Sequence, residues 1–126
     1  MGTVEDVVAV LVGAGYGTFG TNIFTGYLPA SPKTAIMVKV YGGDEDDLLG
    51  YEYPKFQVQV RNANQQTAMT TITAIRATLT RMNTTTNGTW WLVCRALHPP
   101  AQMGQEADSG LFKCYCDFKV IKKIEV

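Results

Sequence analysis

The sequence predicts an α+β fold: a single mixed, mainly antiparallel β-sheet with two helices packed on it, in the order α-β-β-β-α-β-β. Two segments, at the N-terminus and mid-chain, carry apolar residues at helical spacing. The segments between and after them are rich in β-branched and aromatic residues, and several alternate strictly. With 126 residues, 46% of them hydrophobic and 17% charged, residues 1–126 have the size and composition of one domain.

The first helix is expected to be short and amphipathic. Thr3 is a candidate N-cap, with Asp6 three residues later as its capping-box partner. Gly13 and Gly15 end the helix, because glycine takes the left-handed conformation without a steric penalty. Its apolar stripe must pack on another element, and it consists of Val4, Val7, Val8, Leu11 and Val12.

Three strands are expected before the second helix. Residues 18–28 have β-type composition, and residues 34–41 are apolar on both faces, as in a central strand. Residues 56–61 alternate apolar and polar side chains, which predicts a half-buried strand. A polar, acidic loop at 42–50 separates the last two of these strands.

The second helix is expected from Ala63 or Asn64 to Met82, where glycine and proline are absent. Its many threonines are mediocre helix formers, so tertiary packing must hold it. Residues 83–88 are rich in turn-forming residues and are expected to form a turn after this helix. Strands follow at 90–97 and 112–120, joined by a loop at 101–110 and expected to pair antiparallel.

Charge and cysteine content narrow the function classes. Eleven basic residues balance eleven acidic ones, whereas a free-standing nucleic-acid binder usually carries a basic excess. Three cysteines form a poor disulfide framework, which favours a reducing cytosol. We expect no membrane association, because no apolar run approaches the ~20 residues that span a bilayer.

Two motifs resemble ligand sites only in part. Gly15 to Gly20 matches G-x-G-x-x-G, but a helix precedes it and a strand follows, the reverse of a dinucleotide site. We therefore expect a flexible turn here and no cofactor. Asp44, Glu45, Asp46 and Asp47 lack the alternating spacing of a calcium loop. They read as a solvated loop, or as an acidic surface that repels phosphates or meets a basic partner.

Catalytic chemistry finds little support. Cys114 and Cys116 share one strand face, where core packing is expected, and metal binding would need more ligands. Cys94 and His98 would suit a nucleophile pair, but burial is the default for Cys94. The sequence thus predicts no catalytic, cofactor or metal residue.

Candidate interface residues are Arg61, Trp90 and Trp91. The two tryptophans should point to opposite faces of a strand, so one belongs to the core and the other is free to anchor a partner. Arg61 lies at a strand-to-helix junction, where it is an interface residue, a residue packed at the helix N-terminus or a plain surface arginine.

The chain resembles the phage tail terminators, also called bacteriophage minor capsid proteins, over most of its length. Residues 99–110 resemble the family's proline-rich loop with a glycine and an acidic residue, and the 112–120 strand and the opening helix also fit. The central match is a proline and an alternating strand ending in arginine that lead into the long helix, here Tyr53-Pro54-Lys55-Phe56-Gln57-Val58-Gln59-Val60-Arg61.

This resemblance implies a structural virion protein and no enzyme. It implies a homo-hexameric ring at the head-proximal end of the tail, assembled in the host cytoplasm. The implied partners are further copies of the chain, the tail tube protein and a head-completion or connector protein. DNA would pass through the ring without sequence recognition, past a lumen that Asp44–Asp47 would line. The alternatives are another neck protein, a small ligand-binding or enzymatic α+β domain, and a host-directed regulator that binds through its sheet edge.

Overall fold

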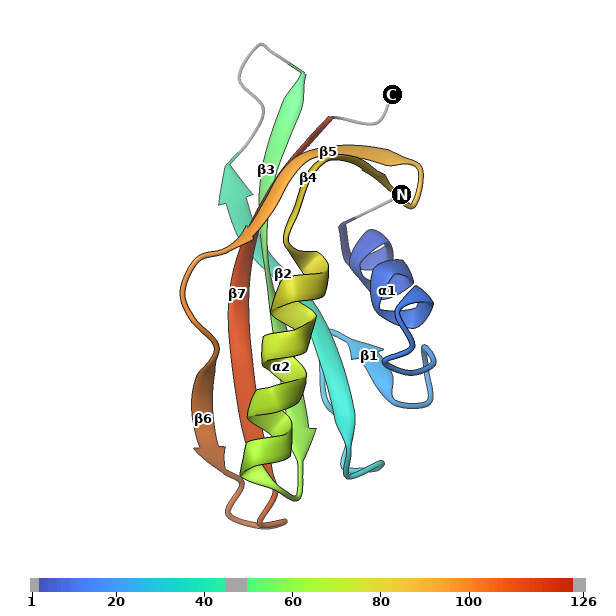
Figure 1. The fold of residues 1–126 in the computed structure, drawn as a ribbon. Helices are drawn as coiled ribbons and strands as arrows, with labels where there is room; N and C mark the ends of the chain where they lie inside the picture. The colour runs from blue at the N-terminus through green and yellow to red at the C-terminus, as the bar shows by residue number, and fades with distance from the viewer. Residues whose placement is uncertain (1–2, 45–49, 124–126) are drawn as a thin grey trace.

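The computed structural model describes residues 3–44 and 50–123, and Figure 1 shows their arrangement. Within these residues the predicted α+β class is confirmed. The two helices and seven strands are, in chain order, α1 (Thr3–Gly13), β1 (Ile23–Thr25), β2 (Ala35–Asp44), β3 (Tyr51–Asn62), α2 (Gln65–Leu79), β4 (Arg81–Thr86), β5 (Thr89–Ala96), β6 (Ala101–Gln105) and β7 (Phe112–Lys123).

One mixed sheet contains every strand, in the order β1-β2-β3-β7-β5-β4. Among the strands that the structure describes, β1 and β2 pair in parallel and the remaining pairings are antiparallel. β3 pairs along β7 from Phe112 to Lys123, while β5 and β6 share the other edge of β7. The mainly antiparallel sheet is confirmed, and so is the antiparallel pairing of the last two predicted strands, now β5 and β7.

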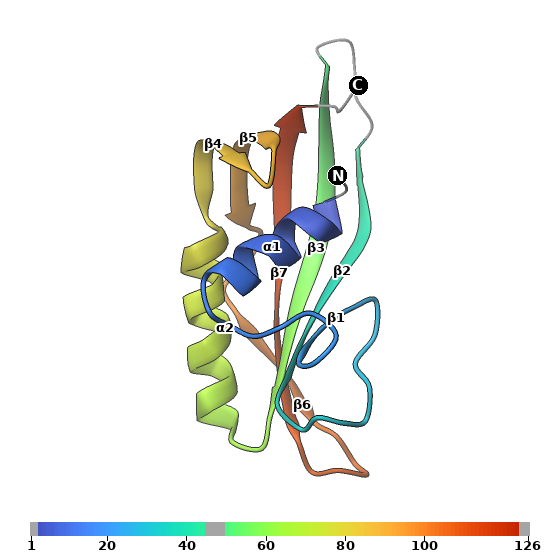
Figure 2. The same cartoon turned by 90° about the vertical axis from the view of Figure 1, so that its right-hand side faces the viewer.

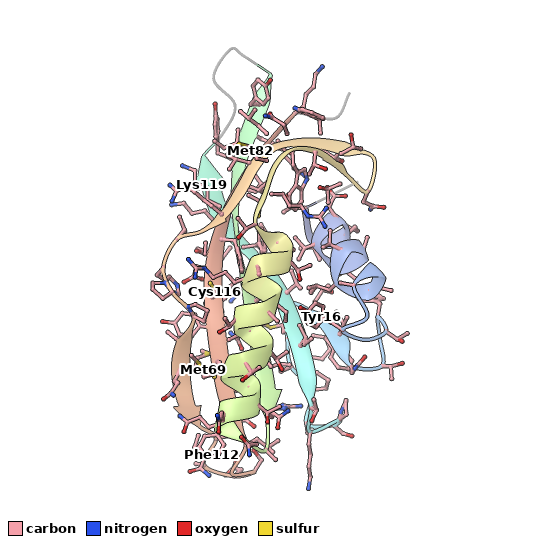
Figure 3. The ribbon with its side chains drawn as sticks, viewed as in Figure 1. Tyr16, Met69, Met82, Phe112, Cys116 and Lys119 are labelled. Carbon is pink, nitrogen blue, oxygen red and sulfur yellow. The ribbon has the colours of Figure 1, made fainter. Side chains whose placement is uncertain are left out.

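Both helices cover the same face of this sheet, as the two views in Figures 1 and 2 show. The core lies between them and alternate residues of the long strands. Tyr16, between the two helices in Figure 3, links them further, since its hydroxyl lies 3.2 Å from Thr78 Oγ1. The largest core side chains are Leu11, Ile23, Phe56, Ile72, Ile75, Leu79, Trp91 and Phe118.

Packing rather than propensity holds α2, as the sequence predicts. Asn64 caps the helix, because its side chain accepts a 3.0 Å hydrogen bond from the Thr67 amide. Thr73 and Thr78 donate their hydroxyls to carbonyls four residues earlier. The stripe that faces the core is fully buried and consists of Ala68, Ile72, Ile75 and Leu79.

The bounds of several elements differ from the prediction. β2 continues to Asp44, into the loop expected at 42–50, and β3 begins at Tyr51, ahead of the strand expected at 56–61. α2 ends at Leu79, because Thr80 adopts an extended backbone (φ −73°, ψ 112°), and Met82 is 71% exposed. The expected turn after it is strand β4, which pairs with β5. Residues 101–105 of the expected loop form β6, and the strand expected at 18–28 shortens to β1.

Candidate functional site

The face of the sheet turned away from α1 and α2 carries a layer of polar side chains, here called the open face. Since Phe56, Val58, Cys116 and Phe118 point into the core, their neighbours along β3 and β7 point the other way. Figure 3 shows Lys119 on the side of β7 away from α1. We define the open face by Lys39, Tyr41, Lys55, Gln57, Gln59, Arg95, Tyr115, Asp117 and Lys119.

A hydrogen-bond network crosses the middle of the open face. Asp117 Oδ1 accepts from Gln57 Nε2 at 3.0 Å, and Gln57 Oε1 accepts from Gln59 Nε2 at 2.6 Å. Asp117 Oδ2 lies 2.7 Å from His98 Nε2. Burial, with Asp117 nearby, raises the pKa of Tyr41. The network therefore joins side chains of β3 and of the segment between β5 and β6 around one carboxylate of β7.

Two acceptors face the ring nitrogens of His98. Its Nδ1 lies 2.6 Å from the Pro99 carbonyl oxygen and its Nε2 lies 2.7 Å from the Asp117 carboxylate, and both contacts favour the protonated ring. The Asp117 amide also points at Nε2, at 3.3 Å, a contact that favours the neutral ring. The Pro99 carbonyl and then the Asp117 carboxylate raise the pKa of His98.

Three cations stand in register across the open face. Lys55 of β3 pairs with Lys119 of β7, which pairs with Arg95 of β5. We call this set the cation row. Its members alternate with core residues along each strand, a signal visible in the sequence. The sequence does not show the strand register that places them side by side.

Arg61 is a structural clamp within the chain. Its side chain is 3% exposed, and it donates to the carbonyls of Pro29 (2.5 Å), Pro32 (2.6 Å) and Lys33 (3.2 Å). Glu106 Oε2 lies 4.0 Å from its Nη1. These contacts fasten the loop before β2 to the end of β3. The buried guanidinium is therefore used within the chain and is not exposed to a partner.

The two tryptophans do take opposite faces, with Trp91 fully buried and Trp90 39% exposed. Trp91 therefore packs inside the chain and is not available to a partner. Trp90 remains the candidate interface residue of the two. A bulge follows Trp91, because the pairing of β5 with β7 shifts between Trp91 and Val93. The bulge brings Cys94 back to the core face, where it is fully buried.

A buried ionic cluster joins α1 to the sheet. Lys122 Nζ lies 3.9 Å from Asp6 Oδ2 and 3.4 Å from Glu52 Oε1, and the Asp6 side chain is fully buried. Asn87 donates to Asp6 Oδ1 at 3.2 Å. Asp6 thus links α1 to β7 and to the turn between β4 and β5, and its capping of Thr3 stays a prediction. Burial raises the pKa of Asp6, against the opposing effects of Asn87 and Lys122.

The glycine motif forms the predicted turn between α1 and β1, and its amides are used inside the loop. The amides of Thr21, Asn22 and Ile23 all lie within 3.2 Å of the Thr18 carbonyl. The Thr18 amide donates to Asn22 Oδ1 at 2.7 Å, and the Gly20 amide donates to the Ile23 carbonyl at 2.9 Å. Amides engaged in this way are not aimed at a phosphate.

The cysteines are core residues, as predicted for Cys114 and Cys116. Burial raises the pKa of Cys94 to about 12 and the pKa of Cys116 to about 11, so both stay thiols. Cys94 lies in the core and His98 contacts Asp117 on the open face, so they form no nucleophile pair. Residues 3–44 and 50–123 contain no group of three metal-ligating side chains and no helix suited to crossing a bilayer.

Two further features concern partner binding. An apolar groove of about 610 Å³ follows the outer side of α1, lined by Val4, Val8, Val12 and Phe19 among others. Phe19 is 58% exposed there. Of the acidic run, Asp44 ends β2, while Glu45, Asp46 and Asp47 lie outside the described residues.

Residues 10–124 match the family model described as bacteriophage tail terminator protein. The chain belongs to the bacteriophage tail terminator family. This tail terminator is a structural component of the phage tail, as the sequence resemblance implies. The match spans the sheet, α2 and all of the open face, whereas Asp6 and part of the groove along α1 precede residue 10.

Solved structures agree with this tail terminator in fold. A chain from the virion of a native gene transfer agent particle has a TM-score of 0.63 at 14% identity, covering 98% of this chain and all of the other. A second solved chain has a TM-score of 0.53 at 12% identity, covering 99% of each. No curated protein matches the sequence significantly.

Proposed function

We propose that this tail terminator forms a homo-hexameric ring that caps the tail tube at its head-proximal end and joins it to the head-completion proteins. The family match over residues 10–124 carries the proposal. The absence of a metal-ligating group from the described residues, together with buried thiols and occupied loop amides, fits a protein that works by assembly.

The described chain has the surfaces that a closed ring requires. A ring is built from heterologous contacts, in which two different patches of each copy meet. The sheet ends in β1 at one edge and β4 at the other, so its two edges differ. Trp90 of β5 is exposed near the β4 edge, and the apolar groove along α1 runs from Asn87 in the β4–β5 turn to Thr25 of β1. These patches support a head-to-tail arrangement.

The other partners follow from the same proposal. The ring contacts the tail tube protein on one side and a head-completion or connector protein on the other, and it needs no cofactor. DNA passes through its lumen without sequence recognition. That Asp44–Asp47 line this lumen remains a prediction from charge alone, for which a high-resolution map of an assembled tail is the test.

The proposal is tested by the native mass and by tube growth. Light scattering gives the mass of the chain alone and mixed with tail tube protein, and electron microscopy gives tube lengths. We expect a hexamer, or copies that bind tube ends and stop elongation. Copies that ignore tubes, with tube lengths unchanged, would overturn the proposal.

A pair of variants tests the role of Trp90. Trp90→Ala should fold normally, because the side chain is partly exposed, yet assemble or cap poorly if it anchors a neighbour. Trp91→Phe is the matched control, because its effect should appear as lost stability. If Trp90→Ala caps tubes as well as the wild type, Trp90 is not an interface residue.

A further inference from the structure

We infer that the cation row Lys55–Lys119–Arg95 binds the phosphate backbone of DNA. The inference rests on the proposed function in one respect, namely that DNA passes close to this chain. The position and the charge of the row are observed in the described residues.

The row is unfavourable for the isolated chain. Residues directly opposite each other on antiparallel strands have Cβ atoms about 5 Å apart, and like charges at such positions destabilise a sheet. Lys55 faces Lys119, and Lys119 faces Arg95, so the same sign is placed side by side twice. An arrangement that opposes folding is expected where a ligand of opposite charge compensates for it.

The described chain does not supply that compensation. Within residues 3–44 and 50–123, the ion pairs involve Arg61, Lys113, Lys122 and His98, and none involves the row. Lys119 has only a cation–π contact, with Nζ 5.9 Å from the Tyr53 ring centroid. Asp117, the acidic residue among those that define the open face, is already engaged by His98 and Gln57.

The composition of the patch favours DNA over an acidic protein surface. Lysine is depleted from the cores of protein interfaces, whereas lysine and arginine clustered on one face are typical of phosphate binding. Two members of the row are lysines, and Lys39 is exposed on the same face. Duplex DNA presents a charge about every 1.7 Å of its axis, so the row meets phosphates without a fixed register.

The balance of charge predicts a weak and local contact. The chain has a formal net charge of zero, so little long-range attraction adds to the row itself. Contacts to phosphates carry no sequence information. A sequence-independent contact that is easily broken positions DNA at the open face and still lets it slide.

Fluorescence anisotropy of a labelled duplex tests the inference on the full chain. With three phosphate contacts, the affinity should fall about 40-fold between about 50 mM and about 200 mM salt, from a slope of roughly −0.9 per contact. Arg95→Gln should bind more weakly at low salt, and its affinity should fall only about 12-fold over the same range. The loss should be equal for duplexes of unrelated sequence.

Arg76→Gln is the matched control, because Arg76 is exposed on α2, on the other side of the sheet, and the substitution removes the same charge. It should leave both affinity and salt slope unchanged. Equal losses in the two variants, or no binding at low salt, would overturn the inference. A polyglutamate peptide that binds more tightly than DNA and is lost with Arg95→Gln would also overturn it, by assigning the row to an acidic protein.

The outcome is separable from that of the proposed function. Ring formation and tube capping are read by mass and tube length, without DNA. Arg95→Gln copies that cap tubes normally while binding DNA more weakly are the expected result. A wild-type chain that caps tubes and does not bind DNA contradicts the inference alone.

Discussion

Two acceptors that face the ring of His98 favour its charged form. The Pro99 carbonyl and the Asp117 carboxylate can each accept a hydrogen bond from a different ring nitrogen, and only the protonated imidazole donates from both. The pKa of His98 is therefore raised above its usual value of about 6.5. Stability from this pair is fully present below about pH 6.5 and is lost as the pH rises through the folded-state pKa.

Removing the carboxylate tests this account of His98. In Asp117→Asn, the pKa of His98 should fall toward its usual value, because the amide carries no negative charge to stabilise the protonated ring. Proton NMR of the imidazole ring measures the titration in both proteins. Since His98 is the only histidine in the chain, its ring signal needs no assignment by mutation. An unchanged pKa in the variant would contradict the account.

Arg61 should tolerate no replacement, even by lysine. Its guanidinium spans three backbone carbonyls from a buried position, and an ammonium lacks that planar fork. We expect Arg61→Lys to lower the free energy of unfolding by about 2 kcal/mol, as measured in urea. Arg95→Lys is the control: the side chain is exposed, so its effect should stay within about 0.5 kcal/mol. Equal effects would contradict the clamp.

Residue roles were the least predictable from sequence. Alternation places Arg61 on the same side of β3 as Gln57 and Gln59, and only the loop at 29–33 buries it. The sequence predicted that one tryptophan is buried but not which, because the bulge after Trp91 shifts the register. Contacts between distant segments decide both cases, and a single sequence does not record them.

At the scale of elements, the missed strand β4 had a local signal. Its sequence is threonine- and asparagine-rich, so it lacks an apolar stripe, and the helical period seemed to reach Met82. The hairpin turn at Asn87 and Gly88, with φ of 49° and 86°, is the favoured Asn-Gly type. That dipeptide, before the strong strand at Thr89–Ala96, could have indicated a hairpin partner.

Gly88 allows this hairpin turn through its left-handed backbone. A Cβ atom at Gly88 meets nothing within 4 Å, so the penalty for Gly88→Ala is conformational. We expect a loss of about 1–2 kcal/mol in thermal or urea unfolding. Gly13→Ala, at the end of α1 and also in open space, should be neutral or stabilising. A neutral Gly88→Ala would contradict the turn assignment.

The tie between α1 and β7 should respond to pH. Lys122→Met leaves the buried Asp6 carboxylate without its cation, which should cost about 3 kcal/mol at neutral pH. The pKa of Asp6 is already raised by burial, so stability from this group falls as pH rises through the folded-state pKa. The defect of Lys122→Met should therefore shrink as the pH is lowered from neutral, because Asp6 takes up a proton at a higher pH than an ordinary aspartate does. Urea unfolding at neutral and at lower pH measures this loss of unfolding free energy. The double variant Asp6→Asn/Lys122→Met is the control and should not regain stability at the lower pH.

At the scale of the molecule, neutral composition hides segregated charge. The eleven basic and eleven acidic residues cancel in total, yet the cation row gathers three of one sign on the open face. Lys55→Gln should raise the free energy of unfolding by about 0.2–1 kcal/mol at low salt, because a repulsive cross-strand pair is removed. The gain should shrink at high salt, and a loss of stability would contradict the repulsion.

The whole fold was predictable because it rests on periodicity. Helical spacing in residues 3–12 and alternation in residues 56–61 and 112–120 placed α1, β3 and β7, which decide the α+β class. The sheet order and the shared helix face were not predictable, since they depend on pairing between distant segments. The ring is harder still to predict from periodicity, because it depends on contacts between surfaces of several copies.

Cryo-electron microscopy of an assembled tail tests the central claim most directly. If the chain is the terminator, its helices and seven-stranded sheet should fit density for a closed ring of six copies between the tail tube and the head-completion proteins. Density for this fold elsewhere in the particle, or a head-proximal ring built from a different fold, would contradict the account.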